Sequence, residues 1–182
     1  MDRPQSAASL EQRPSLKARL ERWLRQQTPL RVFAGLFLIR QFLLLPVLLA
    51  LHTAEIGPAL PQGVVAERLQ SPVFLLYILV VAPIGETAMQ CSLLHLLMRD
   101  AMLRQRLRFI VLSALLMVLV HPWGWVSVPP FVTGAVLAAC YVLFVERRSA
   151  AFAFAMTALL HASFNLLGLP LLVWSAYRTV AS

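Results

Sequence analysis

Residues 150–167 read AAFAFAMTALLHASFNLL, a run of 18 residues that contains no Asp, Glu, Lys or Arg. A run of this length and polarity can cross the hydrocarbon core of a bilayer as one helix. Similar apolar runs precede it at residues 29–51, 72–98, 109–121 and 126–145. The sequence therefore predicts an all-α, polytopic bundle of transmembrane helices. A shorter apolar stretch after Pro170 leaves the expected number of spans at five or six.

The composition excludes an ordinary water-soluble fold. Of the 182 residues, 59% are hydrophobic and only 13% are charged, about half the roughly 25% that is typical of soluble domains. So apolar a chain also does not remain disordered, because it buries its surface in protein or in lipid. Cys91 and Cys140 lie inside apolar runs and form neither a disulfide framework nor a paired metal motif.

Residues 1–28 differ from the rest of the chain, because they are polar and basic and lack the apolar core of a signal peptide. Apolar side chains recur within them at helical spacing: Leu16, Leu20, Trp23 and Leu24. This pattern predicts an amphipathic helix on an anionic membrane surface, with a solvated basic tail as the alternative. We therefore divide the chain into this segment and a transmembrane helical domain over residues 29–182.

Basic residues fall on one side of the predicted membrane at every crossing. The N-terminal segment, the 99–108 loop and the 146–149 turn are rich in arginine, whereas the 52–71 loop contains only Arg68. By the positive-inside rule the basic side faces the cytoplasm, so we expect a cytoplasmic N-terminus. This topology accounts for the net charge of +8, and a nucleic-acid partner is not needed.

Polar side chains inside the apolar runs are the candidates for function, because each one costs a few kcal/mol at membrane depth. The set consists of Arg40, Gln41, Glu86, Thr87, Gln90, His95, His121, His161 and Asn165. Glu86, His121 and His161 each lie 12 or 13 residues from the basic end of their own span, about 18–20 Å along a helix. We therefore expect them at one level. Asn165 shares a helix face with His161, and Gln90 shares one with Glu86.

A carboxylate, two imidazoles and an amide at one depth are suited to hydrolysis. In apolar surroundings a carboxylate can take a proton from water, while an imidazole orients that water or shares the proton. A second imidazole and an amide can stabilise a tetrahedral oxyanion where water is scarce. Glu86, His121 and His161 also match the ligand types of a catalytic zinc site, so a metal-free and a zinc-dependent mechanism both stay open. His95 lies on the opposite helix face from Glu86, and we expect it at the interface without a role in the chemistry.

The stretch APIGET at residues 82–87, followed by His121 and then by HASFN at residues 161–165, resembles the CPBP family of intramembrane proteases. This family includes the CAAX prenyl-protein endopeptidases and bacteriocin self-immunity proteins. Its signature is Glu-Glu-x-x-x-Arg, then Phe-x-x-x-His, then His-x-x-x-Asn, on the first, second and fourth helices of a four-helix catalytic core. The resemblance covers about residues 72–168, with the 126–145 run as the helix without a motif.

The resemblance implies an intramembrane endopeptidase that hydrolyses a peptide bond near the membrane, in the inner membrane of a bacterium. By this match Glu86 and His121 activate water, and His161 and Asn165 stabilise the oxyanion. The expected partners are a membrane-associated protein or peptide substrate and the lipid bilayer.

This chain departs from the family signature at three positions. Thr87 stands where the family has its second glutamate, Cys91 where it has arginine, and Met117 where it has phenylalanine. A register shifted by one residue places Gln90 at the arginine position instead. We expect Thr87, Gln90 and Arg40 to support the site, with Arg40 as a replacement for the lost arginine.

Two other functions fit the same residues. Without the second carboxylate and the arginine, the chain could be a catalytically inactive immunity factor, or an adaptor that binds a partner helix. A small transporter subunit would use Glu86 and the histidines as a proton relay, although the sequence shows no inverted repeat.

Overall fold

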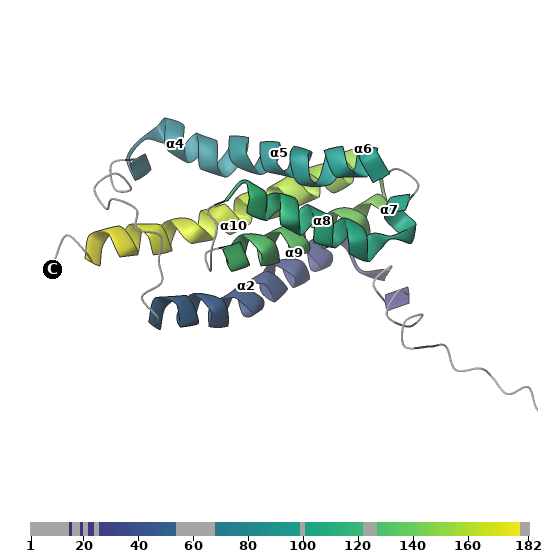
Figure 1. Cartoon of the computed structure of the whole chain (residues 1–182), viewed down its shortest axis with the longest axis horizontal. Helices are drawn as coiled ribbons and strands as arrows, with labels where there is room; N and C mark the ends of the chain where they lie inside the picture. Colours follow the sequence, from purple (N-terminus) through teal and green to yellow (C-terminus); the bar gives the residue numbers. More distant parts are fainter. Residues whose placement is uncertain are drawn as a thin grey trace, which may run out of the picture.

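The structure is a computed structural model of the chain (Figure 1). It describes residues 15, 19, 22–23, 26–53, 68–98, 101–121 and 127–178, with the backbone alone at 51–53 and 170–178. The amphipathic helix predicted within residues 1–28 lies almost entirely outside the described residues. All the regular structure in the described part of the chain is helical, which confirms the predicted all-α fold.

The helical segments follow one another along the chain as α2 (Pro29–Thr53), α4 (Pro72–Leu76), η1 (Tyr77–Val81), α5 (Ala82–Thr87), η2 (Ala88–Leu93), α6 (Leu94–Met98), α7 (Ala101–Arg104), α8 (Arg106–Leu119), α9 (Val128–Val145) and α10 (Ala150–Arg178). The segments from α4 to α6 join without a break into one long helix, which we call the rod. Two of the helices begin at serine caps, since Ser71 Oγ accepts the N–H of Phe74 and Ser149 Oγ accepts that of Phe152.

Among the described residues, four helices are long and apolar enough to cross a membrane: Pro29–Ala50, Pro72–Met98, Val128–Val145 and Ala150–Leu169. The predicted third span corresponds to α8, which has 14 residues and is about 21 Å long, shorter than a hydrocarbon core of about 30 Å. The stretch after Pro170 is not a separate span, because α10 continues through it as one helix. The described part of the chain thus contains four full-length spans, with the shorter helix α8 in the place of the predicted third span.

Helix α9 lies at the centre of the bundle and packs against α8, α10 and α2. In Figure 1, α2 lies along one side of this central layer, and the rod lies along the other side, against α10. In the most apolar 18-residue stretch of α9, 50% of the residues are buried within the protein. The corresponding share is 11% for α2 and for the rod. The outer helices therefore present most of their apolar surface to lipid.

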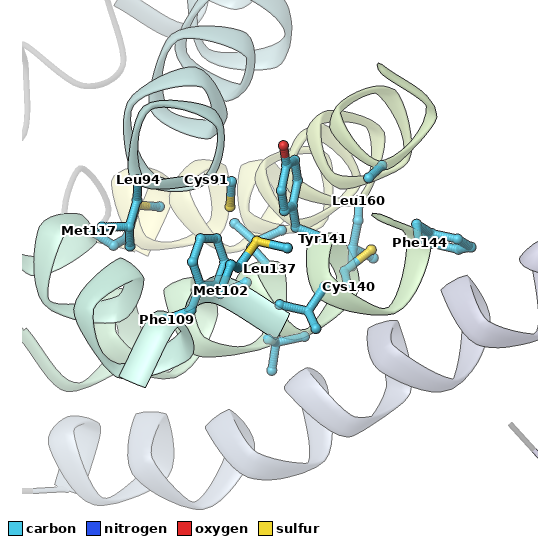
Figure 2. Close-up of a cluster of buried hydrophobic side chains, with 14 of the residues drawn as sticks. Cys91, Leu94, Met102, Phe109, Met117, Leu137, Cys140, Tyr141, Phe144 and Leu160 are labelled. Atoms are coloured by element: carbon cyan, nitrogen blue, oxygen red, sulfur yellow. The ribbon is translucent and has the colours of Figure 1, made fainter. Parts of the chain in front are cut away.

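Aromatic and aliphatic side chains form the core where the helices meet (Figure 2). The largest fully buried side chain is that of Tyr141 on α9, whose ring stacks on Phe109 of α8 with centroids 6.0 Å apart. Gly134 allows α9 to approach α8 closely, because a Cβ atom there would lie 2.7 Å from Met117 Cβ and 3.0 Å from Ala114 Cα. This contact holds α8 against the central helix.

Arginines gather at one end of the bundle, where α7 joins α8 and where α9 turns into α10 (Figure 1). The described members are Arg104, Arg106, Arg108, Arg147 and Arg148. Arg106 Nε lies 2.7 Å from Glu146 Oε1 and so ties the two turns together. We call this the basic end of the bundle.

Candidate functional site

Glu86 lies on the short α-helical segment α5, between two π-helical segments of the rod. A π-helix has more residues in each turn than an α-helix, and such turns occur frequently at functional sites. In η1 the Ala82 N–H donates to Tyr77 O, five residues back, and η2 begins directly after Thr87. The sequence predicted one regular helix here, so the two π-helical turns are a feature that only the structure reveals.

Asn165 supplies a hydrogen bond that the rod lacks. The π-helical pattern of η1 makes Pro83 the residue that would donate to Ile78 O, but proline has no N–H. Asn165 Nδ2 on α10 donates to Ile78 O instead, at 2.7 Å. Asn165 therefore joins α10 to the rod next to α5, through one of the two N–H groups of its amide.

Replacing Asn165 by alanine is expected to destabilise the protein by about 1 kcal/mol, because Ile78 O loses its donor. Pro83→Ala restores a backbone N–H for this carbonyl, so Asn165→Ala should cost much less in the Pro83→Ala background. The measurement is thermal unfolding of the purified protein in detergent micelles. Ser163→Ala is the control on the same helix, since Ser163 only donates to Leu159 O one turn back. Equal costs of Asn165→Ala in both backgrounds would contradict this assignment.

Glu86 and His161 meet where α5 packs against α10. His161 Nε2 lies 3.4 Å from Glu86 Oε2, as expected from their equal depth. Only 3% of the His161 side chain is exposed, whereas 25% of the Glu86 side chain is exposed. His161 Nδ1 has no hydrogen-bond partner among the described residues. The pair therefore joins a buried imidazole to a partly exposed glutamate, whose Oε2 atom is itself buried.

His121, at the end of α8, is the third member of this cluster. Its Nδ1 lies 2.8 Å from the backbone carbonyl oxygen of Met117. Because a carbonyl oxygen only accepts, Nδ1 is the donor, and the lone pair of the neutral imidazole is on Nε2. His121 is close enough to interact electrostatically with both Glu86 and His161. His121 therefore lies within electrostatic range of the Glu86–His161 pair, while its described hydrogen bond is to Met117.

Arg40 on α2 is held by three contacts, and none of those described involves Glu86. Its Nε donates to Thr133 Oγ1 on α9 at 3.3 Å, and its Nη1 donates to Gln41 Oε1 at 2.9 Å. Its guanidinium carbon lies 4.7 Å from the centre of the Phe164 ring on α10, a cation–π contact. Arg40 therefore does not stand beside Glu86 as a replacement for the family arginine, because these groups hold it between α2, α9 and α10.

Thr87 and Gln90 follow Glu86 along the rod and are completely buried. Within the part of the chain that the structure describes, neither Thr87 Oγ1 nor the two polar atoms of the Gln90 amide have a hydrogen-bond partner. Cys91, at the position of the family arginine, is also buried, and its Sγ lies 3.8 Å from Ser113 Oγ on α8. Uncharged polar groups, with no cation, therefore follow Glu86 on this part of the rod.

The cluster does not form a metal site in this arrangement. Among the described residues, no three His, Cys, Asp or Glu side chains converge closely enough to hold a metal ion. Glu86 and His161 approach each other, but His121 does not join them at the distance that a set of three ligands requires. The zinc set of Glu86, His121 and His161 therefore does not converge in this arrangement.

His95 has a partner that the sequence did not predict. Its Nδ1 lies 2.9 Å from the hydroxyl oxygen of Tyr141 on α9, and the two rings meet edge to face. Both residues line a pocket near the basic end of the bundle. The sequence already contained the polar side chains of Thr133 and Tyr141 in the 126–145 run, which could have indicated such a contact. By the family resemblance this run was the helix without a motif, so these side chains were not considered.

No protein-family model, curated protein or solved structure matches this chain. The geometry of the cluster and the spacing of its motifs therefore carry the functional interpretation.

Proposed function

We propose that this integral membrane protein is an intramembrane endopeptidase in which Glu86 activates water for attack on a peptide bond. The observation that carries the proposal is the 3.4 Å contact between Glu86 Oε2 and His161 Nε2, with His121 in electrostatic range of both. Ionisable side chains within membrane spans are rare and are functional candidates by default. The resemblance to the CPBP family supports the proposal, since the family motifs fall on these three residues.

The proposed reaction begins with a water molecule that His121 orients. Glu86 accepts a proton from this water while the water oxygen attacks the carbonyl carbon of the peptide bond. The carbonyl double bond becomes a single bond, and the negative charge moves to its oxygen. The Nε2–H of His161 then donates a hydrogen bond to this oxyanion. Collapse of the intermediate breaks the C–N bond, and Glu86 returns its proton to the leaving amine.

Neighbouring polar groups support the binding of the peptide and its oxyanion. The bond of Asn165 Nδ2 to Ile78 O uses one of two N–H groups, which leaves the second for the oxyanion. Thr87 and Gln90 are completely buried, so in this proposal they support Glu86 from within the bundle and do not contact the peptide. Arg40 interacts electrostatically with the cluster, and its positive charge favours the negatively charged intermediate.

The setting of the site indicates how substrate would arrive. The four full-length apolar spans support a location in a lipid bilayer, and we place the basic end on the cytoplasmic side of a bacterial inner membrane. A quarter of the Glu86 side chain is exposed at the surface of the bundle. The proposed substrate is therefore a membrane-associated protein or peptide that approaches Glu86 from the side.

The experiment that tests this function compares the peptide termini of the membrane proteome in host cells that carry the wild-type protein or Glu86→Gln. We expect termini that are present with the wild type and lost with Glu86→Gln, and these termini identify the substrates. Glu146→Gln is the matched control, since it removes a carboxylate that pairs with Arg106 at the basic end. Identical termini in the wild type and in Glu86→Gln, at equal protein levels, would argue against proteolysis.

A second candidate function is that of an inactive scaffold of the same kind, which binds a partner helix as an immunity factor or adaptor. It is favoured by the lack of a cation in contact with Glu86 among the described residues. The position of the family arginine is occupied by Cys91, which is buried, and Arg40 is held by Thr133.

The two functions are distinguished by the double variant His121→Ala/His161→Ala. An inactive scaffold keeps its protective effect or its partner in this variant, as measured by co-purification from detergent extracts. If the protein is a protease, the peptide termini that it produces in the membrane proteome are absent with this variant.

A further inference from the structure

A pocket of about 720 Å³ lies near the basic end, between the end of the rod and the start of α10. Its volume falls within the range of about 300–1,000 Å³ that is typical of small-molecule sites. Most of its wall is apolar, with side chains that include Leu96, Met102, Leu103, Val145 and Phe154. His95, which lines it, lies nine residues and about 13 Å along the rod from Glu86, so the pocket is separate from the Glu86 cluster.

One polar spot interrupts the apolar wall. The Nδ1 of His95 and the hydroxyl oxygen of Tyr141 lie 2.9 Å apart, and Ser92 lines the pocket from the preceding turn of the rod. The ring of Tyr141 is part of the buried core, with its hydroxyl directed away from the other labelled side chains (Figure 2). Core packing therefore fixes the polar pair in place. The combination of an apolar wall and one fixed polar spot suits an amphiphilic ligand.

The rim of the pocket is positively charged. The two described segments beside it, residues 101–108 and 145–150, together contain five arginines and one acid. Arg106 lies at the edge, since its Nε donates at 3.2 Å to the carbonyl oxygen of Leu103, which lines the pocket. The same Nε pairs with Glu146, and 47% of the Arg106 side chain is exposed. An arginine has four further N–H groups on its two Nη atoms, which can bind an anion in the fork geometry that suits phosphate.

We infer that this pocket binds one anionic phospholipid of the surrounding membrane, with an acyl chain against the apolar wall and the phosphate at Arg106. The basic end lies at the level of the lipid headgroups, where arginines attract anionic lipids. A peptide would need hydrogen-bond partners along its backbone, whereas this wall offers them at one spot only. The inference does not depend on the proposed proteolysis, because the lipid would bind whether or not Glu86 is catalytic.

The test uses the full-length protein, purified in detergent and incubated with equal amounts of phosphatidylglycerol and phosphatidylcholine. Native mass spectrometry counts the lipids that stay bound, and the wild type should retain one phosphatidylglycerol. Ala151→Trp fills the pocket from an exposed position that lines it, and Arg106→Gln removes the phosphate contact. Each variant should lower the occupancy by phosphatidylglycerol at least about fivefold, which corresponds to about 1 kcal/mol.

Two variants serve as matched controls and should keep wild-type occupancy. Leu159→Trp adds the same side chain to an exposed position two turns further along α10. Arg108→Gln removes an arginine two residues from Arg106 that binds Gln105 instead of the pocket edge. Inorganic phosphate at millimolar concentration should not displace the lipid.

Four results would overturn the inference. Equal retention of the two lipids, or full occupancy in Ala151→Trp, would indicate an unselective shell of lipid. Equal losses in Arg106→Gln and Arg108→Gln would indicate diffuse attraction by the basic end. Displacement by inorganic phosphate would indicate a site for a free anion. Arg106→Gln leaves the apolar wall unchanged, so the test stands even where Ala151→Trp does not fold.

Discussion

Glu86→Gln is expected to cleave its substrate at least about 100-fold more slowly than the wild type, because a positioned general base contributes about 10²–10⁴-fold. The amide keeps the size of the side chain, but it does not take a proton from water. The cleavage rate is measured in detergent micelles, on a peptide identified from the termini of the membrane proteome. The unfolding temperature of the variant should stay close to that of the wild type.

The contact between Glu86 and His161 at 3.4 Å makes a sharper form of this prediction possible. His161→Gln should also slow cleavage, because it removes the imidazole that faces the carboxylate. If both residues act in one step, the double variant should be no slower than Glu86→Gln alone. If the cleavage rate of the double variant falls by the product of the two single-variant factors, the two residues do not act in one shared step. A wild-type rate in Glu86→Gln would remove this carboxylate from the mechanism altogether.

Gly134→Ala is expected to lower the free energy of unfolding by about 1–3 kcal/mol, because the added methyl group has no space. A Cβ at this position would lie 2.7 Å from Met117 Cβ and 3.0 Å from Ala114 Cα, so α8 and α9 have to move apart. The carbonyl of Met117 also holds the ring of His121, so a displaced α8 should lower the cleavage rate as well. The measurement is thermal unfolding in micelles, followed by the cleavage assay at a temperature where the variant is folded.

Gly35→Ala on α2 is the matched control for this prediction. No described atom lies within 4 Å of a Cβ at Gly35, so the methyl group meets no obstacle. Alanine is also the better helix former by about 0.5–1 kcal/mol, and this variant should be at least as stable as the wild type. A loss in Gly134→Ala no greater than the change in Gly35→Ala would contradict the close packing of α8 and α9.

Much of the bundle could be predicted from the sequence, because lipid imposes simple rules on a chain. A backbone in hydrocarbon has to satisfy its own hydrogen bonds, so long uncharged runs become helices. Four of the predicted runs are full-length helices in the structure. Because the rise per residue of a helix is fixed, the depth of each polar residue could be calculated from the basic end of its helix. These depths were sufficient to predict that Glu86 and His161 lie close together.

The remaining features depend on contacts between distant segments, which helical periodicity does not encode. The π-helical turns beside Glu86 are accompanied by a bond between Asn165 on α10 and a carbonyl of η1. Arg40 was expected beside Glu86, but a hydrogen bond to Thr133 holds it elsewhere. Thr133 lies on α9, the helix in which the sequence predicted no functional residue. The contact of His95 with Tyr141 likewise joins two runs whose pairing the sequence left open.

The short helix α8 has a consequence for the bilayer itself. It is about 21 Å long, and only residues 120–127 separate its end from the start of α9. Helix α8 itself therefore ends several ångströms short of the far side of a hydrocarbon core of about 30 Å. The bilayer next to so short a span becomes locally thinner, at a small energetic cost. Water on the arginine-poor side is thereby brought nearer to His121, and the proposed hydrolysis should slow in vesicles made of lipids with longer acyl chains.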